Sequence, residues 1–257
     1  MRPSLPARRV AADGPSTPAA TLEQTVVDGH ALSVKIPAVA ASGKPWLWVA
    51  EYPGHLQSLE DGLVLRGWHV AHVKVSGQFG SARAMAIWEK VYAELCGRRG
   101  LSARPALLGI SRGGLEVCAW VRRHPGWASV LYLDNGLCDA RSWPGGFPLK
   151  SKAEGSAKDW ERYKAEFEFA TDEEACSRSL RPAEGLDQAV KAGVLLISVH
   201  GTADAIVPYL DNAEPVVQFW EQARGRLRVF AKPGGNHHPH GLPDPAPLIE
   251  LLCTEAQ

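Results

Sequence analysis

The chain has 257 residues, in which 28 lysines and arginines balance 28 aspartates and glutamates. This length fits one domain with a sizeable core. The even charge balance argues against nucleic acid or an anionic membrane as a partner. Five cysteines without CxxC spacing argue against a zinc ribbon or a dense disulfide framework.

No stretch approaches the roughly 18 apolar residues that a membrane-spanning helix needs. Residues 1–20 hold arginines and prolines but no continuous apolar segment, which predicts a disordered leader rather than a secretory signal. We therefore expect a soluble, cytoplasmic protein, or a secreted one if a signal was removed before residue 1. Residues 21–257 are expected to form a single domain.

The ordered part is predicted to begin with an antiparallel hairpin, because residues 24–27 and 31–36 flank Asp28-Gly29, a typical tight turn. The next expected elements are a buried strand over residues 46–51, a helix over 56–66 and a strand over 68–75. The helix that follows, over residues 81–96, has Ser81 as a plausible N-cap and Gly97 as its stop.

The second half continues the alternation of strands and helices. Strands are predicted over residues 105–110, 128–133, 193–199 and 227–232, and helices over 111–124, 216–223 and 247–253. Such alternation after one hairpin predicts an α/β fold with a mostly parallel central sheet and helices on both faces.

One long insertion, over about residues 137–190, interrupts this alternation. It contains the run Trp143-Pro144-Gly145-Gly146-Phe147 and a predicted helix through residues 160–169, which is rich in aromatic side chains. An insertion at this point lies near the carboxyl ends of the strands, where ligands bind. The segment is therefore interpreted either as a lid over a pocket or as packing on the edge of the domain.

A candidate nucleophile lies at Ser111. Residues 109–113, Gly-Ile-Ser-Arg-Gly, match G-x-S-x-G between an apolar strand and a predicted helix, which is the setting that this motif requires. Glycines at the flanking positions leave room for a tight turn. The helix that starts behind Ser111 directs backbone N–H groups at developing negative charge, so the N–H of Arg112 is a predicted oxyanion donor.

A serine nucleophile needs a base and an acid that orients the base. Asp204 follows the strand over residues 193–199, and His237 follows the strand over 227–232, which gives the chain order Ser, Asp, His of this fold. Asp134 is the competing acid. His237 comes first after the glycine turn and is the predicted base, with His238 as the alternative.

The cluster of His237, His238 and His240 also has a second interpretation, as a set of metal ligands. No Asp, Glu or Cys stands beside these histidines, and a triad needs only one imidazole. We therefore predict no metal and no organic cofactor.

Five segments together resemble a bacterial branch of the α/β-hydrolase superfamily, similar to carboxylesterases and to esterases that act on substituted sugars. They are residues 52–55 (YPGH), 111–114 (SRGG), 138–146 (CDARSWPGG), 200–208 (HGTADAIVP) and 237–242 (HHPHGL). The likeness covers about residues 46–253. It implies His237 as the base and the backbone N–H of Tyr52 as the second oxyanion donor, although Asn236 stands where a glycine often precedes the histidine.

Three further side chains are predicted near the site. Arg112 is interpreted as steadying the turn by pairing with Glu51 or Asp134, or as meeting a substrate carboxylate. His55 and Trp143 are candidate pocket residues, and each has packing as its alternative.

The predicted function is hydrolysis of a small-molecule carboxylic ester through an acyl-enzyme, with acylated sugars among the candidate substrates. The alternatives are a serine peptidase or thioesterase of the same fold, or a binding protein without activity.

Overall fold

A computed structural model describes residues 20–255, so the leader predicted over residues 1–20 lies, apart from its last residue, outside the described part. The described chain forms one eight-stranded sheet in the order β1-β2-β4-β3-β5-β6-β7-β8. The strands are β1 (Thr21–Val27), β2 (His30–Ile36), β3 (Trp46–Val49), β4 (His69–Val73), β5 (Ala106–Ile110), β6 (Val130–Asp134), β7 (Leu195–Gly201) and β8 (Leu227–Lys232).

Strands β1 and β2 form the predicted antiparallel hairpin, and β2 also pairs antiparallel with β4. The remaining neighbours pair in parallel. The hairpin turn has Asp28 and Gly29 at positive φ, 51° and 78°, which the tight turn between these strands requires. The carboxyl ends of the parallel strands therefore meet along one edge of the sheet, where a ligand site is expected.

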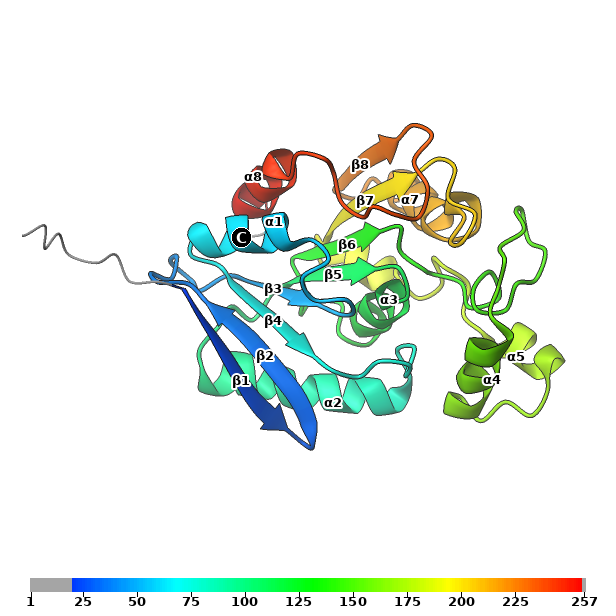
Figure 1. The fold of residues 1–257 in the computed structure, drawn as a ribbon, viewed down its shortest axis with the longest axis horizontal. Helices are drawn as coiled ribbons and strands as arrows, with labels where there is room; N and C mark the ends of the chain where they lie inside the picture. The colour runs from blue at the N-terminus through cyan, green and yellow to red at the C-terminus, as the bar shows by residue number, and fades with distance from the viewer. Residues whose placement is uncertain (1–19, 256–257) are drawn as a thin grey trace, which may run out of the picture.

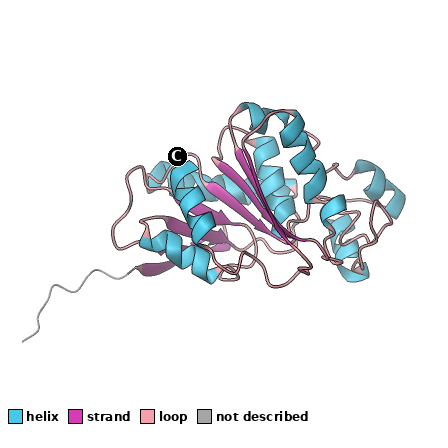
Figure 2. Ribbon diagram, turned by 90° about the horizontal axis from the view of Figure 1, so that it is seen from above, coloured by secondary structure: helices cyan, strands magenta, loops and turns pink. Residues whose placement is uncertain are grey.

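Helices cover both faces of the sheet (Figures 1 and 2). Buried side chains of α1 (Gln57–Leu65) and α8 (Ala246–Glu255) pack with β3, β5, β6 and β7 on one face. Those of α2 (Ala82–Tyr92), α3 (Gly113–Arg123) and α7 (Ala213–Gln222) form the core on the other face. In that second core the indole of Trp48 stacks on that of Trp88, with 4.1 Å between ring centroids.

The predicted helix over residues 81–96 is confirmed at its start and wrong at its end. The side chain of Ser81 accepts a hydrogen bond from the N–H of Ala84 at 3.2 Å, as an N-cap should. Gly97 does not stop the helix, because the chain continues from α2 into a π-helix, Ala93–Arg98.

The insertion carries three helices, α4 (Ala157–Glu166), α5 (Asp172–Arg178) and α6 (Asp187–Lys191). The first ends before Phe167 and Phe169, which the sequence placed within it, and the other two were not predicted. Helices α4 and α5 stand to one side of the sheet (Figure 1). Trp160 and Tyr163 are buried in a separate small core with Phe79 and Leu115, so these two aromatic rings pack at the edge of the domain.

Among residues 20–255, no helix combines the length and the apolar character needed to cross a membrane.

Candidate active site

Ser111 lies in the turn between β5 and α3 with φ 47°, an unfavourable region for a residue other than glycine. Its backbone is held at both sides: the N–H donates to the carbonyl oxygen of Asp134 at 3.0 Å, and its carbonyl oxygen accepts from the N–H of Leu137 at 2.8 Å. The strained turn therefore keeps the hydroxyl fixed at the carboxyl edge of the sheet.

Gly109, in the motif, and Gly114, just after it, are required by close packing around this turn. A Cβ at Gly109 would lie 2.6 Å from Val117 Cγ2 and 2.9 Å from the Cα of Gly114. A Cβ at Gly114 would collide with the carbonyl oxygen of Leu137. Gly109 thus lets α3 pack closely on β5, and Gly114 lets the loop after β6 approach α3 closely.

The structure brings Ser111, His237 and Asp204 together in one chain of hydrogen bonds. His237 Nε2 lies 2.9 Å from Ser111 Oγ, and its Nδ1 lies 2.7 Å from Asp204 Oδ2. The tautomer that donates from Nδ1 to the carboxylate leaves Nε2 free to accept the serine proton. This arrangement has the geometry of a Ser-His-Asp triad.

Asp204 is itself oriented by the backbone of its own loop. Its Oδ1 accepts hydrogen bonds from the N–H groups of Ile206 and Val207, both at 2.9 Å, which leaves Oδ2 for His237. The side chains of Asp204 and His237 are 1% and 6% exposed. The charge-assisted bond between them is therefore shielded from water.

Asn135, at the end of β6, was missed by sequence reasoning. Its Nδ2 donates to the carbonyl oxygen of His237 at 2.7 Å, and its Oδ1 accepts from the N–H of Gly201 at 2.8 Å. One amide thus connects the end of β7, three residues before Asp204, to the loop after β8, which carries His237. The available signal was a single asparagine two residues after the predicted strand over residues 128–133, a residue type that tolerates the φ of 43° found here.

The two alternative residues lie elsewhere. Asp134, the competing acid, accepts from the hydroxyl of Tyr132 at 2.8 Å and from the N–H of Gly241 at 3.0 Å, and its Oδ1 lies 3.1 Å from His240 Nδ1. Within residues 20–255, Asp134 forms no hydrogen bond or ion pair with the His237 side chain. Asp134 therefore anchors the histidine loop to β6, and the structure does not place it as the third member of the triad.

His238, the alternative base, is exposed and makes no hydrogen bond within residues 20–255. Its ring lies edge-on to those of His237 and His240, with centroids 4.8 Å away in each case. Partial burial, together with the two neighbouring imidazoles, lowers the pKa of His238. The lowered pKa favours the neutral form of this ring beside the triad.

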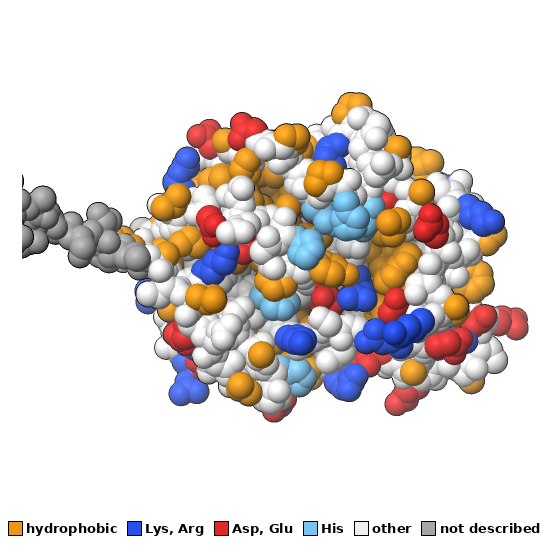
Figure 3. All heavy atoms as spheres, viewed as in Figure 1, with side chains coloured by type: hydrophobic (Ala, Val, Ile, Leu, Met, Phe, Trp, Pro, Cys, Tyr) orange, Lys and Arg blue, Asp and Glu red, His pale blue; other side chains and the backbone are white. Residues whose placement is uncertain are grey.

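Histidine side chains gather on one face of the molecule (Figure 3). One ring nitrogen each from His237, His238 and His240 lie within 4.8 Å of one another, so the cluster has the composition of a possible metal site. Both ring nitrogens of His237 already form hydrogen bonds to Ser111 and Asp204. A metal at His237 would have to displace one of these partners.

The two predicted oxyanion donors are backbone N–H groups of Arg112 and Tyr52. Arg112 is the N-cap residue of α3, and Tyr52 follows β3 with φ 59°. Within residues 20–255, neither N–H donates a hydrogen bond to the protein. Both are thus available to a developing negative charge, and the helix dipole of α3 adds to the field at Arg112.

The Arg112 side chain is held by one carboxylate and three aromatic rings. Its Nε lies 3.3 Å from Glu51 Oε1, and the guanidinium carbon lies 5.7, 5.9 and 6.0 Å from the ring centroids of Tyr52, Phe79 and Trp143. Of the two predicted acid partners, Glu51 is therefore the one that binds it, and Asp134 is not. Ser76 also donates to Glu51, at 3.0 Å.

Glu116, on the first turn of α3, is fully buried, and neither carboxyl oxygen has a hydrogen-bond partner in the described residues. Burial, together with the nearby negative charge of Glu51, raises the pKa of Glu116 well above its usual range, and Arg112 opposes this shift. This shift favours the protonated, neutral form of the side chain.

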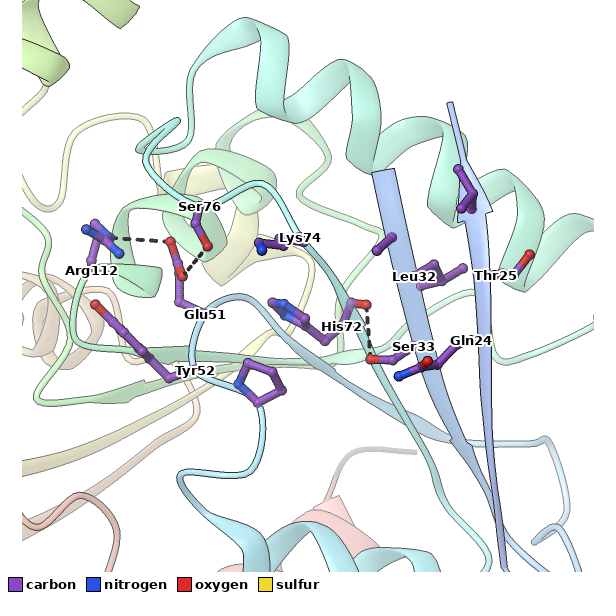
Figure 4. Close-up of a pocket in the computed structure, with 13 residues that line it drawn as sticks. Gln24, Thr25, Leu32, Ser33, Glu51, Tyr52, His72, Lys74, Ser76 and Arg112 are labelled. Carbon is purple, nitrogen blue, oxygen red and sulfur yellow. Dashed lines mark hydrogen bonds and ion pairs between the residues drawn. The ribbon is translucent and has the colours of Figure 1, made fainter. Parts of the chain in front are cut away.

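A cavity of about 650 Å³ opens beside Tyr52 and Arg112 and reaches the β1-β2 hairpin (Figure 4). Neither predicted pocket residue lines it. His55 is exposed, with its ring 5.1 Å from that of Tyr52, and lines a smaller cavity near His240. Trp143 is half-buried against Arg112. The sequence did not predict that the β1-β2 hairpin lines the larger cavity.

Comparison with solved structures shows the fold. A puromycin-hydrolyzing peptidase of Mycobacterium tuberculosis is similar, with a TM-score of 0.64 and 16% identity over 95% of this chain and 39% of the peptidase chain. The 2,6-dihydroxy-pseudo-oxynicotine hydrolase is similar with a TM-score of 0.63 and 18% identity, over 93% and 68% of the two chains. This chain thus spans well under half the length of the peptidase.

No family model matches the sequence, and no curated protein matches it at a significant level. The strand order and these structural neighbours together define an α/β-hydrolase fold, and the fold predicted from the sequence is confirmed.

Proposed function

We propose that this protein is a serine hydrolase that cleaves carboxylic esters through an acyl-enzyme. The observation that supports this most directly is the continuous hydrogen-bond chain from Ser111 Oγ through His237 to Asp204, beside two free backbone N–H groups. Each group required for acyl transfer is then present in one buried arrangement.

In the proposed reaction, Ser111 Oγ attacks the ester carbonyl carbon while its proton passes to His237 Nε2. The N–H groups of Arg112 and Tyr52 stabilise the oxyanion, and Asp204 stabilises the imidazolium. Collapse of the tetrahedral intermediate breaks the bond to the alcohol, which leaves with the proton from His237. Water then attacks the acyl-enzyme with His237 as base, and the acid is released as the proton returns to Ser111.

The substrate class is proposed as small-molecule esters, with acylated sugars as the first group to examine. The sequence resemblance to carbohydrate esterases supports this choice. The polar side chains that line the cavity near Tyr52, among them Gln24, Thr25 and Ser76, supply hydrogen-bonding groups that suit a hydroxylated substrate.

The test compares native protein with Ser111→Ala on 4-nitrophenyl acetate, with circular dichroism as the check of folding. We expect turnover in the native protein and a loss of about 10³-fold or more in the variant. Equal turnover in the two would overturn the proposal. A panel of acetylated and feruloylated sugars, simple esters, thioesters and peptides then ranks substrates by kcat/KM, and a preference for peptides would replace esterase by peptidase.

A further inference from the structure

The cavity of Figure 4 lies directly beside the proposed oxyanion site. Tyr52 and Arg112, whose backbone N–H groups are the two proposed donors, contribute to its wall. Its far wall is the β1-β2 hairpin, where Leu32 and Ser33 line it. A substrate with its carbonyl at Ser111 can therefore extend part of its structure into this space.

The cavity contains a cation without a partner. The side chain of Lys74, just after β4, is exposed and forms no hydrogen bond or ion pair within residues 20–255. The carboxylate of Glu51 is already occupied by Arg112 and Ser76. In Figure 4, Glu51 and Ser76 lie between Arg112 and Lys74. Lys74 thus brings a positive charge to the wall that the protein itself leaves uncompensated.

Arg112 adds further donors at the same cavity. A guanidinium has five N–H donors, and within the described residues only the Nε–H of Arg112 has a hydrogen-bond partner, namely Glu51. The terminal N–H groups are therefore free for a planar acceptor such as a carboxylate. The side chain is 15% exposed, so a charge bound to it is partly shielded from water.

The remaining ionisable groups near the cavity do not cancel this charge. Burial lowers the pKa of His72, whose Nδ1 lies 3.0 Å from the carbonyl oxygen of Val49. The raised pKa of Glu116, with which Arg112 also interacts, favours the neutral form of that side chain. Among the lining residues, the formal charges of Lys74, Arg112 and Glu51 sum to one net positive charge.

We propose that this cavity is a substrate subsite for a carboxylate, bound by Lys74 and by the terminal N–H groups of Arg112. The inference rests on the proposed hydrolase function and narrows its substrates to esters with an acidic group in the acyl or the alcohol part. Gln24, Thr25 and Ser33 provide neutral polar contacts around the carboxylate-bearing segment.

Two matched substrate pairs test this. Mono-4-nitrophenyl adipate and 4-nitrophenyl hexanoate differ by a carboxylate in the acyl part, and 3-acetoxybenzoate and 3-acetoxytoluene differ by one in the alcohol part. For at least one pair, native kcat/KM should be about tenfold higher for the acidic ester at low salt. This ratio should fall as NaCl is raised, because salt screens the exposed charge of Lys74.

The matched variants are Lys74→Met and Lys158→Met, the second an exposed lysine of α4 outside the cavity. Lys74→Met should lower the acidic-to-neutral ratio about tenfold, chiefly through KM, and Lys158→Met should leave the ratio as in the native protein. Measurable turnover of the neutral ester shows that each variant is folded.

The subsite proposal would be overturned if the native ratio of kcat/KM for the acidic ester to kcat/KM for the neutral ester is one or less in both pairs. It would also be overturned if Lys74→Met does not change this ratio. Failure of the proposed function is distinguishable, because neutral-ester turnover would then survive Ser111→Ala.

Discussion

The side-chain amide of Asn135 donates a hydrogen bond to the backbone carbonyl oxygen of His237 at 2.7 Å. The same side chain accepts from the N–H of Gly201, three residues before Asp204. Asn135 therefore sets the relative position of the two loops that must bring base and acid into contact. Its own placement follows from β6, the strand between β5 and β7 in the sheet.

Asn135→Gly should lower kcat on a nitrophenyl ester by about 10-fold to 100-fold, with a smaller effect on KM. Glycine tolerates the φ of 43° at this position, so the change removes the amide and not the backbone conformation. Without the hydrogen bonds of the Asn135 amide, the imidazole of His237 can shift. Small displacements of a catalytic group lower the turnover rate strongly. A kcat within twofold of the native value would show that the loops hold their positions without Asn135.

The two neighbouring histidines should respond differently to replacement. His237→Ala removes the group between Ser111 and Asp204, and kcat should fall by about 10³-fold or more. His238→Ala removes an exposed ring and should retain kcat within about threefold. Steady-state kinetics of both variants measures this, and a larger loss for His238→Ala would mean that the base is the second histidine.

Replacement of Asp204 should affect mainly activity, and replacement of Asp134 should affect mainly stability. Asp204→Asn breaks the charge-assisted bond that orients His237, and kcat should fall about 10³-fold with little loss of fold. Asp134→Asn leaves a donor facing the Tyr132 hydroxyl or the Gly241 N–H, and should cost about 1–3 kcal/mol of stability. Urea unfolding and kinetics distinguish the two, and the reverse pattern would make Asp134 the catalytic acid.

Much of the fold was predictable because local patterns and tertiary structure agree. The Asp28-Gly29 turn, the alternating strands and helices, and the glycines around Ser111 each have a short-range cause. The end of α2 was not predictable, since Gly97 lies in a π-helix that packing of Leu95 supports. Helices α5 and α6 are short, with seven and five residues, and carry little periodic signal.

The site was predictable in its chemistry and less so in its surroundings. Strand ends and chain order indicated Ser111 and Asp204, but adjacency alone could not choose between His237 and His238. That choice depends on how the loop after β8 is held by Asn135 and Asp134. The cavity wall formed by the β1-β2 hairpin was missed, because residues so distant in sequence meet only through sheet order.

Glu116 should make stability depend on pH. The unfolded chain loses this proton near the ordinary pKa of about 4.3, whereas the folded protein keeps it because burial raises the pKa of Glu116. The contribution of Glu116 to the free energy of unfolding is therefore fully present below about pH 4 and is lost as the pH rises. The glutamine of Glu116→Gln is neutral at every pH. The Tm of this variant, minus the Tm of the native protein, should therefore increase between pH 4.5 and pH 8.

The control for that measurement is Glu250→Gln, the same replacement at an exposed position of α8. Its Tm should follow the native Tm across the same range. A constant difference between Glu116→Gln and native protein at all pH values would show that Glu116 is ionised in the folded state.

The most direct measurement of the central claim is covalent labelling with diethyl 4-nitrophenyl phosphate, located by peptide mass spectrometry. The serine oxygen attacks phosphorus, nitrophenolate leaves, and the phosphorylated serine cannot be released readily by water. We predict one diethylphosphoryl group per chain on Ser111, loss of turnover in proportion to labelling, and no label in Ser111→Ala. Label on another residue, or full turnover with Ser111 modified, would contradict the account.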